Sequence, residues 1–278
     1  MKLFKKIFQI VVWVIAIGTL GVVFAFVQEK EEEQLCSKVN IDIERNPLQE
    51  NFFVEENAIR TLIAQKFGQI ENAPLKDIDV NALERIMYSN PWVQKADVYL
   101  SIDGITNIEI IQRNPLLRII NKSGVSYYID STGKLMPWSP DFTARTIIAT
   151  GNISETFETW QSHTIEEIIN NDTLKTQTHL DDLYMMTKFI LADGFWSAFV
   201  EQIYLNNNNE IELVPNVGNH KIIFGDLQNM EEKFWKLKVF YKEGLNYTGW
   251  DNYDTLNLKY NNQVVCTKKK IKPISNNK

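Results

Sequence analysis

The longest apolar run in the chain lies close to its N-terminus, at residues 7–27, and reads IFQIVVWVIAIGTLGVVFAFV. It contains no charged side chain. A helix needs about 20 apolar residues to cross the hydrocarbon core of a bilayer. Lipid offers no partner for an unpaired backbone group, so such a segment must be helical throughout. We therefore expect a transmembrane helix over residues 7–27.

The charges on either side of this run predict its orientation. Basic side chains precede it, at Lys2, Lys5 and Lys6. Acidic side chains follow it, at Glu29, Glu31, Glu32 and Glu33. Because the basic flank of a span stays in the cytoplasm, we expect a cytoplasmic tail over residues 1–6 and an extracytoplasmic chain beyond Val27. A cleaved signal peptide is the alternative, but its apolar core is usually about 7–15 residues and ends at small residues.

The rest of the chain has an ordinary globular composition, and the net charge of the full chain is −6, which argues against a nucleic-acid partner. Two cysteines, Cys36 and Cys266, are too few to predict a disulfide framework, and the sequence leaves open whether they are free or bridged. Residues 28–37 are expected to form a linker. Residues 268–278 are expected to form a basic tail.

Residues 38–113 predict a compact α+β domain with the order strand, helix, helix, strand, strand. Period-2 alternation, typical of strands, occurs at residues 39–43, 96–102 and 108–110. Helical spacing of apolar residues occurs at residues 58–66 and 83–87. Asp103-Gly104 is a strong hairpin signal between the last two strands. Asn81 with Glu84 fits a capping box at the second helix. Pro91 disfavours helix at Asn90 and so ends that helix.

Residues 114–267 predict a mostly antiparallel β-domain carrying two helices. Short strands separated by turn residues fill residues 117–136, which is typical of successive hairpins. Helical spacing occurs at residues 180–191 and 234–241, each followed by a glycine. Further strands are expected at residues 203–205, 211–214, 221–224, 256–260 and 263–267.

Four strings in this order resemble one bacterial family, the division protein FtsQ, called DivIB in some bacteria. The strings are Asn90–Val98 (NPWVQKADV), Arg113-Asn114-Pro115, Tyr128–Gly133 (YIDSTG) and Leu256–Tyr260 (LNLKY) with Gln263–Val265. The resemblance covers nearly the whole chain. It implies one membrane span, a POTRA domain over residues 38–113 and a β-domain over residues 114–267.

The resemblance also implies a function. Members are non-enzymatic divisome scaffolds in the bacterial cytoplasmic membrane, with periplasmic domains, at the division septum. The β-domain would bind FtsB and FtsL and connect to FtsW and its septal transpeptidase, whereas the POTRA domain would serve recruitment by earlier division proteins. FtsK is a further expected partner, direct or indirect. No cofactor or small-molecule substrate is implied. Asn90, Pro91, Trp92 and Val93 belong either to recruitment or to the POTRA fold.

The resemblance places FtsB on the last strands of the β-domain. The expected contact residues are Leu258, Tyr260, Asn262, Gln263, Val264, Val265, Cys266 and Thr267. A C-terminal strand suits a sheet edge, whose unpaired backbone groups accept a partner strand. Tyr260 then suits an aromatic anchor, although Tyr260 and Val264 also suit simple core packing. Lys268, Lys269 and Lys270 suit protection of an edge against self-pairing.

Two other classes of function remain as alternatives. For an enzyme, His163, His179 and His220 lie in unrelated segments without metal-ligand spacing, and no nucleophile elbow or phosphate loop occurs. We therefore expect no enzymatic activity. The second alternative is a POTRA-containing envelope-assembly or secretion module. Such proteins typically repeat the domain, whereas one copy is recognisable here.

Overall fold

The computed structural model describes residues 12–22, 34–45 and 52–269. Residues 12–22 are helical and exposed. Among the described residues, no helix combines the length and the apolar character that crossing a membrane requires. The expected span over residues 7–27 extends beyond the described helical residues at both ends, so it stays a prediction. The expected cytoplasmic tail, most of the linker and most of the basic tail also lie outside the described residues.

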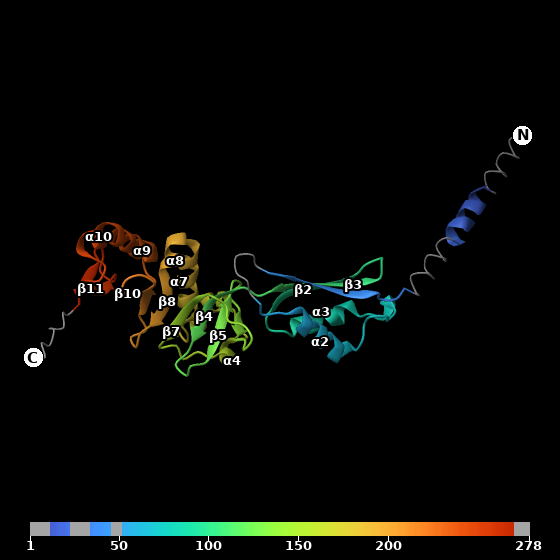
Figure 1. The fold of residues 1–278 in the computed structure, drawn as a ribbon, viewed down its shortest axis with the longest axis horizontal. Helices are drawn as coiled ribbons and strands as arrows, with labels where there is room; N and C mark the ends of the chain where they lie inside the picture. Colours follow the sequence, from blue (N-terminus) through green and yellow to red (C-terminus); the bar gives the residue numbers. More distant parts are fainter. Residues whose placement is uncertain (1–11, 23–33, 46–51, 270–278) are drawn as a thin grey trace, which may run out of the picture. The chain divides into compact units, whose positions relative to one another are not determined.

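The chain divides into two compact units, one ending at Gln112 and the other beginning at Arg113. The first unit contains a three-stranded sheet in the order β1-β3-β2, with β1 parallel and β2 antiparallel to β3. Its elements are β1 (Lys38–Glu44), α2 (Glu56–Phe67), a 3-10 turn (Leu75–Asp77), α3 (Val80–Tyr88), β2 (Val93–Leu100) and β3 (Ile105–Gln112). The predicted order of elements is thereby confirmed. Figure 1 shows α2 and α3 covering one face of this sheet.

The core of the first unit follows from the alternation along its strands. Buried side chains of the sheet and of the two helices form it, among them Val39, Ile59, Ile63, Leu83, Met87, Val98, Ile108 and Ile110. Two details differ from the sequence prediction. Ile102, the last residue of the strand pattern predicted over residues 96–102, is 97% exposed, because the strand ends at Leu100 and the turn begins before Gly104 (φ +83°). The N-cap of α3 is Asp79, whose carboxylate accepts from Ala82 N at 2.9 Å, rather than Asn81.

The second unit is built on one mixed nine-stranded sheet in the order β12-β11-β10-β9-β8-β7-β4-β5-β6. Its strands are β4 (Pro115–Ile120), β5 (Ser126–Asp130), β6 (Leu135–Pro137), β7 (Ile147–Gly151), β8 (Val200–Leu205), β9 (Ile211–Pro215), β10 (Lys221–Gly225), β11 (Tyr253–Asn257) and β12 (Val265–Lys268). Neighbouring strands pair antiparallel except at three places, β4 with β7, β7 with β8 and β10 with β11. The sheet is thus antiparallel-rich but mixed.

More helices accompany this sheet than the two predicted. The predicted pair corresponds to α7 (Leu180–Ala192) and α9 (Met230–Val239). The additional segments are α4 (Phe157–Trp160), α5 (Ile165–Ile169), α6 (Asp172–Lys175), α8 (Gly194–Phe199), the π-helical η2 (Phe240–Gly244) and α10 (Leu245–Thr248). Each of these is too short to display a clear helical period in the sequence.

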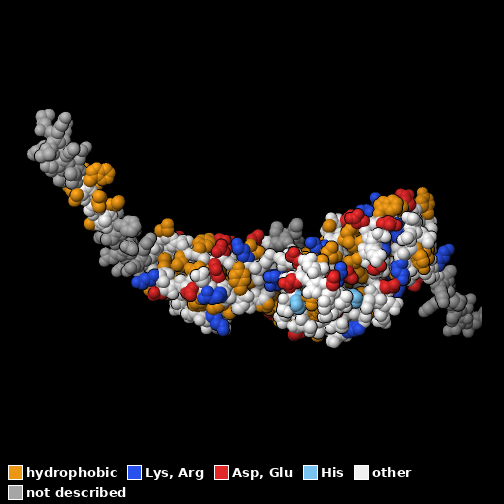
Figure 2. Space-filling view, turned by 180° about the vertical axis from the view of Figure 1, so that it is seen from behind, with side chains coloured by type: hydrophobic (Ala, Val, Ile, Leu, Met, Phe, Trp, Pro, Cys, Tyr) orange, Lys and Arg blue, Asp and Glu red, His pale blue; other side chains and the backbone are white. Residues whose placement is uncertain are grey.

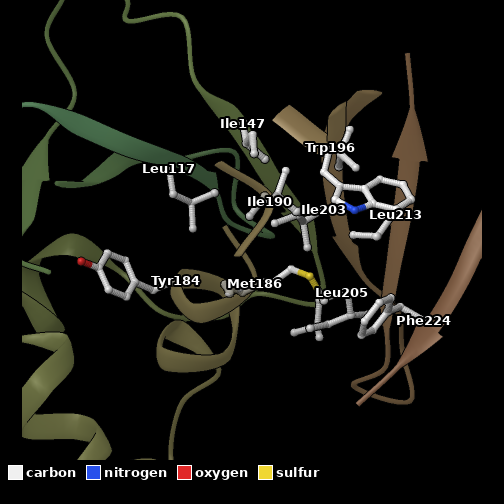
Figure 3. Close-up of a cluster of buried hydrophobic side chains, with 14 of the residues drawn as sticks. Leu117, Ile147, Tyr184, Met186, Ile190, Trp196, Ile203, Leu205, Leu213 and Phe224 are labelled. Carbon is white, nitrogen blue, oxygen red and sulfur yellow. The ribbon is translucent and has the colours of Figure 1, made fainter. Parts of the chain in front are cut away.

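The core of the second unit lies between its sheet and its helices. Figure 3 shows side chains from the sheet and from α7 and α8 pointing toward one another, including Leu117, Ile147, Met186, Ile190, Trp196, Ile203, Leu213 and Phe224. Burial alternates along the strands, as in β8, where buried Ile203 and Leu205 flank exposed Tyr204. Helix α7 buries a wide face because it packs directly on the sheet.

Two of the family-like strings meet at the start of this unit. Arg113 Nη1 lies 3.4 Å from Asp130 Oδ2 and donates to Leu135 O at 3.1 Å. Asp130 is 1% exposed, and its other oxygen accepts from Thr132 N, Thr132 Oγ1 and Lys134 N at 2.7–3.0 Å. The ion pair therefore fixes the β5–β6 turn against the first residue of the unit.

Candidate partner-binding edge

The two sheets present four edges, and helix α3 covers the one at β2. Glu84 Oε1 accepts from Val98 N at 3.1 Å, and the Tyr88 hydroxyl donates to Ala96 O at 3.3 Å. Both backbone groups belong to an edge strand, where unpaired N–H and C=O groups invite another strand. The side chains of α3 therefore occupy positions that an added strand would need.

The edges at β1 and β6 are covered by other means. Arg60 Nη2 on α2 donates to Val39 O at 3.1 Å, which occupies an acceptor of β1. Strand β6 ends at Pro137, which has no backbone N–H to donate. Lys134, just before β6, also forms a β-bridge with Thr164. Each of these three edges is thus partly closed to a partner.

Strand β12 forms the fourth edge, and it is different. It pairs on one side with β11, with Leu256 opposite Cys266 and Asn257 opposite Val265. In the described part of the chain, no helix or loop donates to or accepts from its other side. The C-terminal strand therefore lies at an open sheet edge.

The ends of the last two strands differ from the sequence prediction. Strand β11 ends at Asn257, not at residue 260, and β12 begins at Val265, not at residue 263. The strand β11 ends there because Asn257 Oδ1 accepts from Lys259 N at 3.0 Å, which turns the backbone. Asn262 has a left-handed φ of +57°. Gln263 and Val264 therefore lie in the β11–β12 loop rather than in the strand.

The expected contact residues fall into two groups. Leu258 is fully buried, so its side chain belongs to the core, and Val264 and Cys266 are half-buried against that core. Both cysteines are free, and burial raises the pKa of the Cys266 thiol. The exposed group is Tyr260 (49%), Val265 (40%), Asn262, Gln263 and Thr267. This second group is available to a partner.

Two lysines that the sequence analysis did not single out hold the β11–β12 loop. Lys236 on α9 is buried, and its Nζ donates to Tyr260 O at 2.6 Å. Lys259 Nζ donates to Glu210 Oε1 at 2.6 Å, which raises the pKa of Lys259 and lowers that of Glu210. These partners lie 24 and 49 residues apart in sequence. No local pattern signals such contacts.

The Asn90–Val93 motif lies at the start of β2 in the first unit. Asn90 Oδ1 accepts from Trp92 N at 3.0 Å, and Val93 is buried. Pro91 is exposed, and Trp92 is half-buried. Residues 89–92 also line a groove with the exposed side of α2. The motif thus has a local structural role and an accessible surface, so both sequence interpretations stay open.

Among the described residues, no group of three or more His, Cys, Asp or Glu side chains is placed to hold a metal. Figure 2 shows acidic and basic side chains interspersed over the visible face. The feature that does stand out is therefore the open backbone edge of β12.

Comparison with known protein families agrees with both units. The family described as FtsQ/DivIB, C-terminal related, matches residues 114–267, more than half of the chain. A POTRA-like domain matches residues 34–111. No curated protein matches the chain. The family is one of non-enzymatic division scaffolds. The chain belongs to the FtsQ/DivIB family of bacterial cell-division proteins.

Proposed function

We propose that this protein is a membrane-anchored divisome scaffold whose β12 edge binds FtsB by strand addition. FtsL joins through FtsB, and the complex connects to FtsW and its septal transpeptidase. The POTRA domain serves recruitment by earlier division proteins, with FtsK as a candidate partner. The observation that carries the proposal is the open edge of β12 beside the exposed side chains of Tyr260 and Val265.

Strand addition fits this edge better than the other three. A partner strand gains backbone hydrogen bonds from the edge and specificity from the side chains beside it. Tyr260 can supply an aromatic contact on a backbone that Lys236 already fixes. Such pre-organisation reduces the ordering cost of binding. Lys268, which is exposed at the end of β12, discourages pairing of two such edges with each other.

Two substitutions at one position test the strand-addition model. Lys269 N donates to Asn252 O, so alternate residues of β12 face β11 and the Cys266 N–H faces the open side. Cys266→Pro removes that open-side donor, whereas Cys266→Ala keeps it and shortens the side chain. We expect Cys266→Pro to abolish FtsB pull-down and Cys266→Ala to weaken it only partly. Thermal unfolding of the full chain in detergent verifies that each variant is folded. A folded Cys266→Pro variant that still retains FtsB would refute strand addition.

The proposed topology places residues 1–6 in the cytoplasm, residues 7–27 in the inner membrane and both units in the periplasm. It rests on the apolar run and on the lysines that precede it. Protease added to spheroplasts should digest both units while sparing an N-terminal epitope tag. Protection of the units from the protease would contradict this topology.

Imaging distinguishes the division scaffold from a general envelope-assembly module. A fluorescent fusion to the N-terminus should concentrate at midcell before constriction. A uniform signal around the envelope would contradict the division role of this chain. The FtsQ/DivIB match over residues 114–267 favours the first result.

A further inference from the structure

A buried histidine lies close to the β11–β12 edge. His220 precedes β10 and is 6% exposed. Its Nε2 lies 2.7 Å from the Tyr241 hydroxyl on the π-helical segment η2. Its Nδ1 is buried and has no hydrogen-bond partner in the described part of the chain. A neutral imidazole can leave one nitrogen unpaired more easily than an imidazolium, whose two N–H groups both need acceptors.

The surroundings of this ring resist protonation. The backbone of Gly218 covers Nδ1 so closely that a Cβ there would lie 2.8 Å from it. The charged groups near the ring are Lys269, just after β12, and Asp251, before β11. Burial, and then Lys269, lower the pKa of His220, whereas Asp251 acts in the opposite direction. The folded chain therefore holds His220 in its neutral form.

His220 is connected to the proposed binding edge through a short chain of contacts. Tyr241 stacks on Trp250, with ring centroids 5.4 Å apart. Trp250 lies in the turn that leads into β11. Asn252 O in the same turn accepts a hydrogen bond, at 3.0 Å, from the backbone N–H of Lys269, which directly follows β12. Opening of the His220–Tyr241 contact would therefore release the turn that holds both ends of the β11–β12 hairpin.

We propose that His220 is an acid-sensitive latch: its protonation separates it from Tyr241, releases the turn at residues 249–252 and weakens the β12 edge for its partner. This regulation rests on the proposed function of the edge. An exposed histidine titrates near pH 6.5, whereas the buried ring stays neutral. Separation of His220 from Tyr241 therefore becomes more favourable as the pH falls, because only the exposed ring binds the proton. One proton taken up on opening changes the opening equilibrium by about tenfold between pH 7.5 and 5.5.

Hydrogen exchange of the full chain in detergent measures the latch without any partner. After correction for the intrinsic exchange rate, protection of amides in η2 and β11 should fall about tenfold from pH 7.5 to 5.5. His220→Gln keeps a polar group near Tyr241, but glutamine does not titrate. Protection of the η2 and β11 amides in this variant should therefore not fall between pH 7.5 and 5.5. His163→Gln, which removes a histidine elsewhere in the same unit, should behave like the wild type. Because His220→Gln risks unfolding, an NMR titration of the wild-type imidazole gives a second measurement, and it should show His220 titrating at lower pH than an exposed histidine.

FtsB pull-down at the two pH values then tests the regulation. Loss of binding at pH 5.5 in the wild type, but not in His220→Gln, supports it. An equal pH response in both chains, or none in the wild type, overturns the latch. Loss of protection without loss of binding overturns its link to the edge. If FtsB bound neither the wild type nor His220→Gln at pH 7.5, the proposed function would be refuted instead. The pH dependence of hydrogen exchange would then be the test of the latch.

Discussion

Asp130 offers the sharpest test of how the second unit is held together. Its carboxylate is 1% exposed and receives four contacts, three from the β5–β6 turn and one from Arg113. Replacing it with alanine removes all of them and leaves the guanidinium of Arg113, itself only 19% exposed, without its carboxylate partner. Asp130→Ala therefore disrupts a buried ion pair and a turn at once.

The magnitude follows from these contacts. Removing one member of a buried ion pair costs about 3–5 kcal/mol. We expect Asp130→Ala to lower the free energy of unfolding of the second unit by about that amount. Asp130→Asn keeps an acceptor for Thr132 and Lys134 and should cost less, about 1–3 kcal/mol, because mainly the ion pair is lost. Asp141→Ala, at an exposed aspartate of the same unit, should change stability by less than about 0.5 kcal/mol.

Urea unfolding followed by tryptophan fluorescence provides the assay. Five of the seven tryptophans lie in the second unit, so the signal reports mainly on it. A double-mutant cycle with Arg113→Met should give a coupling free energy of about 1–3 kcal/mol between Arg113 and Asp130. A cost below about 1 kcal/mol for Asp130→Ala, or a coupling free energy near zero, would refute this account of the junction.

Three further predictions concern other parts of the chain. Since the folded state lowers the pKa of His220, stability is complete above about pH 6.5 and falls below it, by up to about 1.4 kcal/mol per pH unit. Urea midpoints of His220→Gln should lack this component, and an identical pH profile would contradict it. Trp92→Ala should lower the free energy of unfolding by about 1–3 kcal/mol, because a half-buried aromatic is removed. An unchanged thermal midpoint with lost midcell recruitment would make Trp92 a contact instead. Asp42 of β1 and Asp97 of β2 each lie directly opposite Glu109 of β3, so three like charges are neighbours on the sheet. Asp42→Asn removes one of these charges and should raise the free energy of unfolding by about 0.2–1 kcal/mol. A lower melting temperature would contradict this.

Elements with a strong local signal could be predicted from the sequence. Asp103-Gly104 marked the β2–β3 hairpin because a positive φ at Gly104 costs no steric strain. The apolar spacing of α7 predicted its buried face, including Leu183 and Ile190. The parallel pairing of β10 with β11 could not be read in this way, because it arises through the intervening α9, η2 and α10. Pairing across such a connection leaves no pattern within either strand.

The candidate edge was predictable in location but not in detail. Its terminal position and the family-like strings indicated β11 and β12, which the structure places at one end of the nine-stranded sheet. The loop between them depends on Lys236 and on the Lys259–Glu210 pair, whose partners are remote in sequence. Leu258 looked like an interface residue, yet its side chain is fully buried in the core, and its N–H donates to Ile223 O at 2.9 Å, which extends the pairing toward β10. The neighbouring strand thus decided which side chains stay exposed.

The length of β12 limits what backbone pairing alone can contribute to the proposed binding of FtsB. In a strand of four residues, alternate residues direct both backbone groups to the open side, which permits about four hydrogen bonds. At about 1 kcal/mol net for each bond, these supply about 4 kcal/mol, equivalent to a dissociation constant of about 1 mM. Any tighter complex must draw on side chains beside the edge, and Tyr260 and Val265 are the large exposed ones there. Lys236, which fixes the Tyr260 backbone without being exposed, should therefore influence affinity although it does not contact the partner, and Lys236→Met should weaken FtsB pull-down.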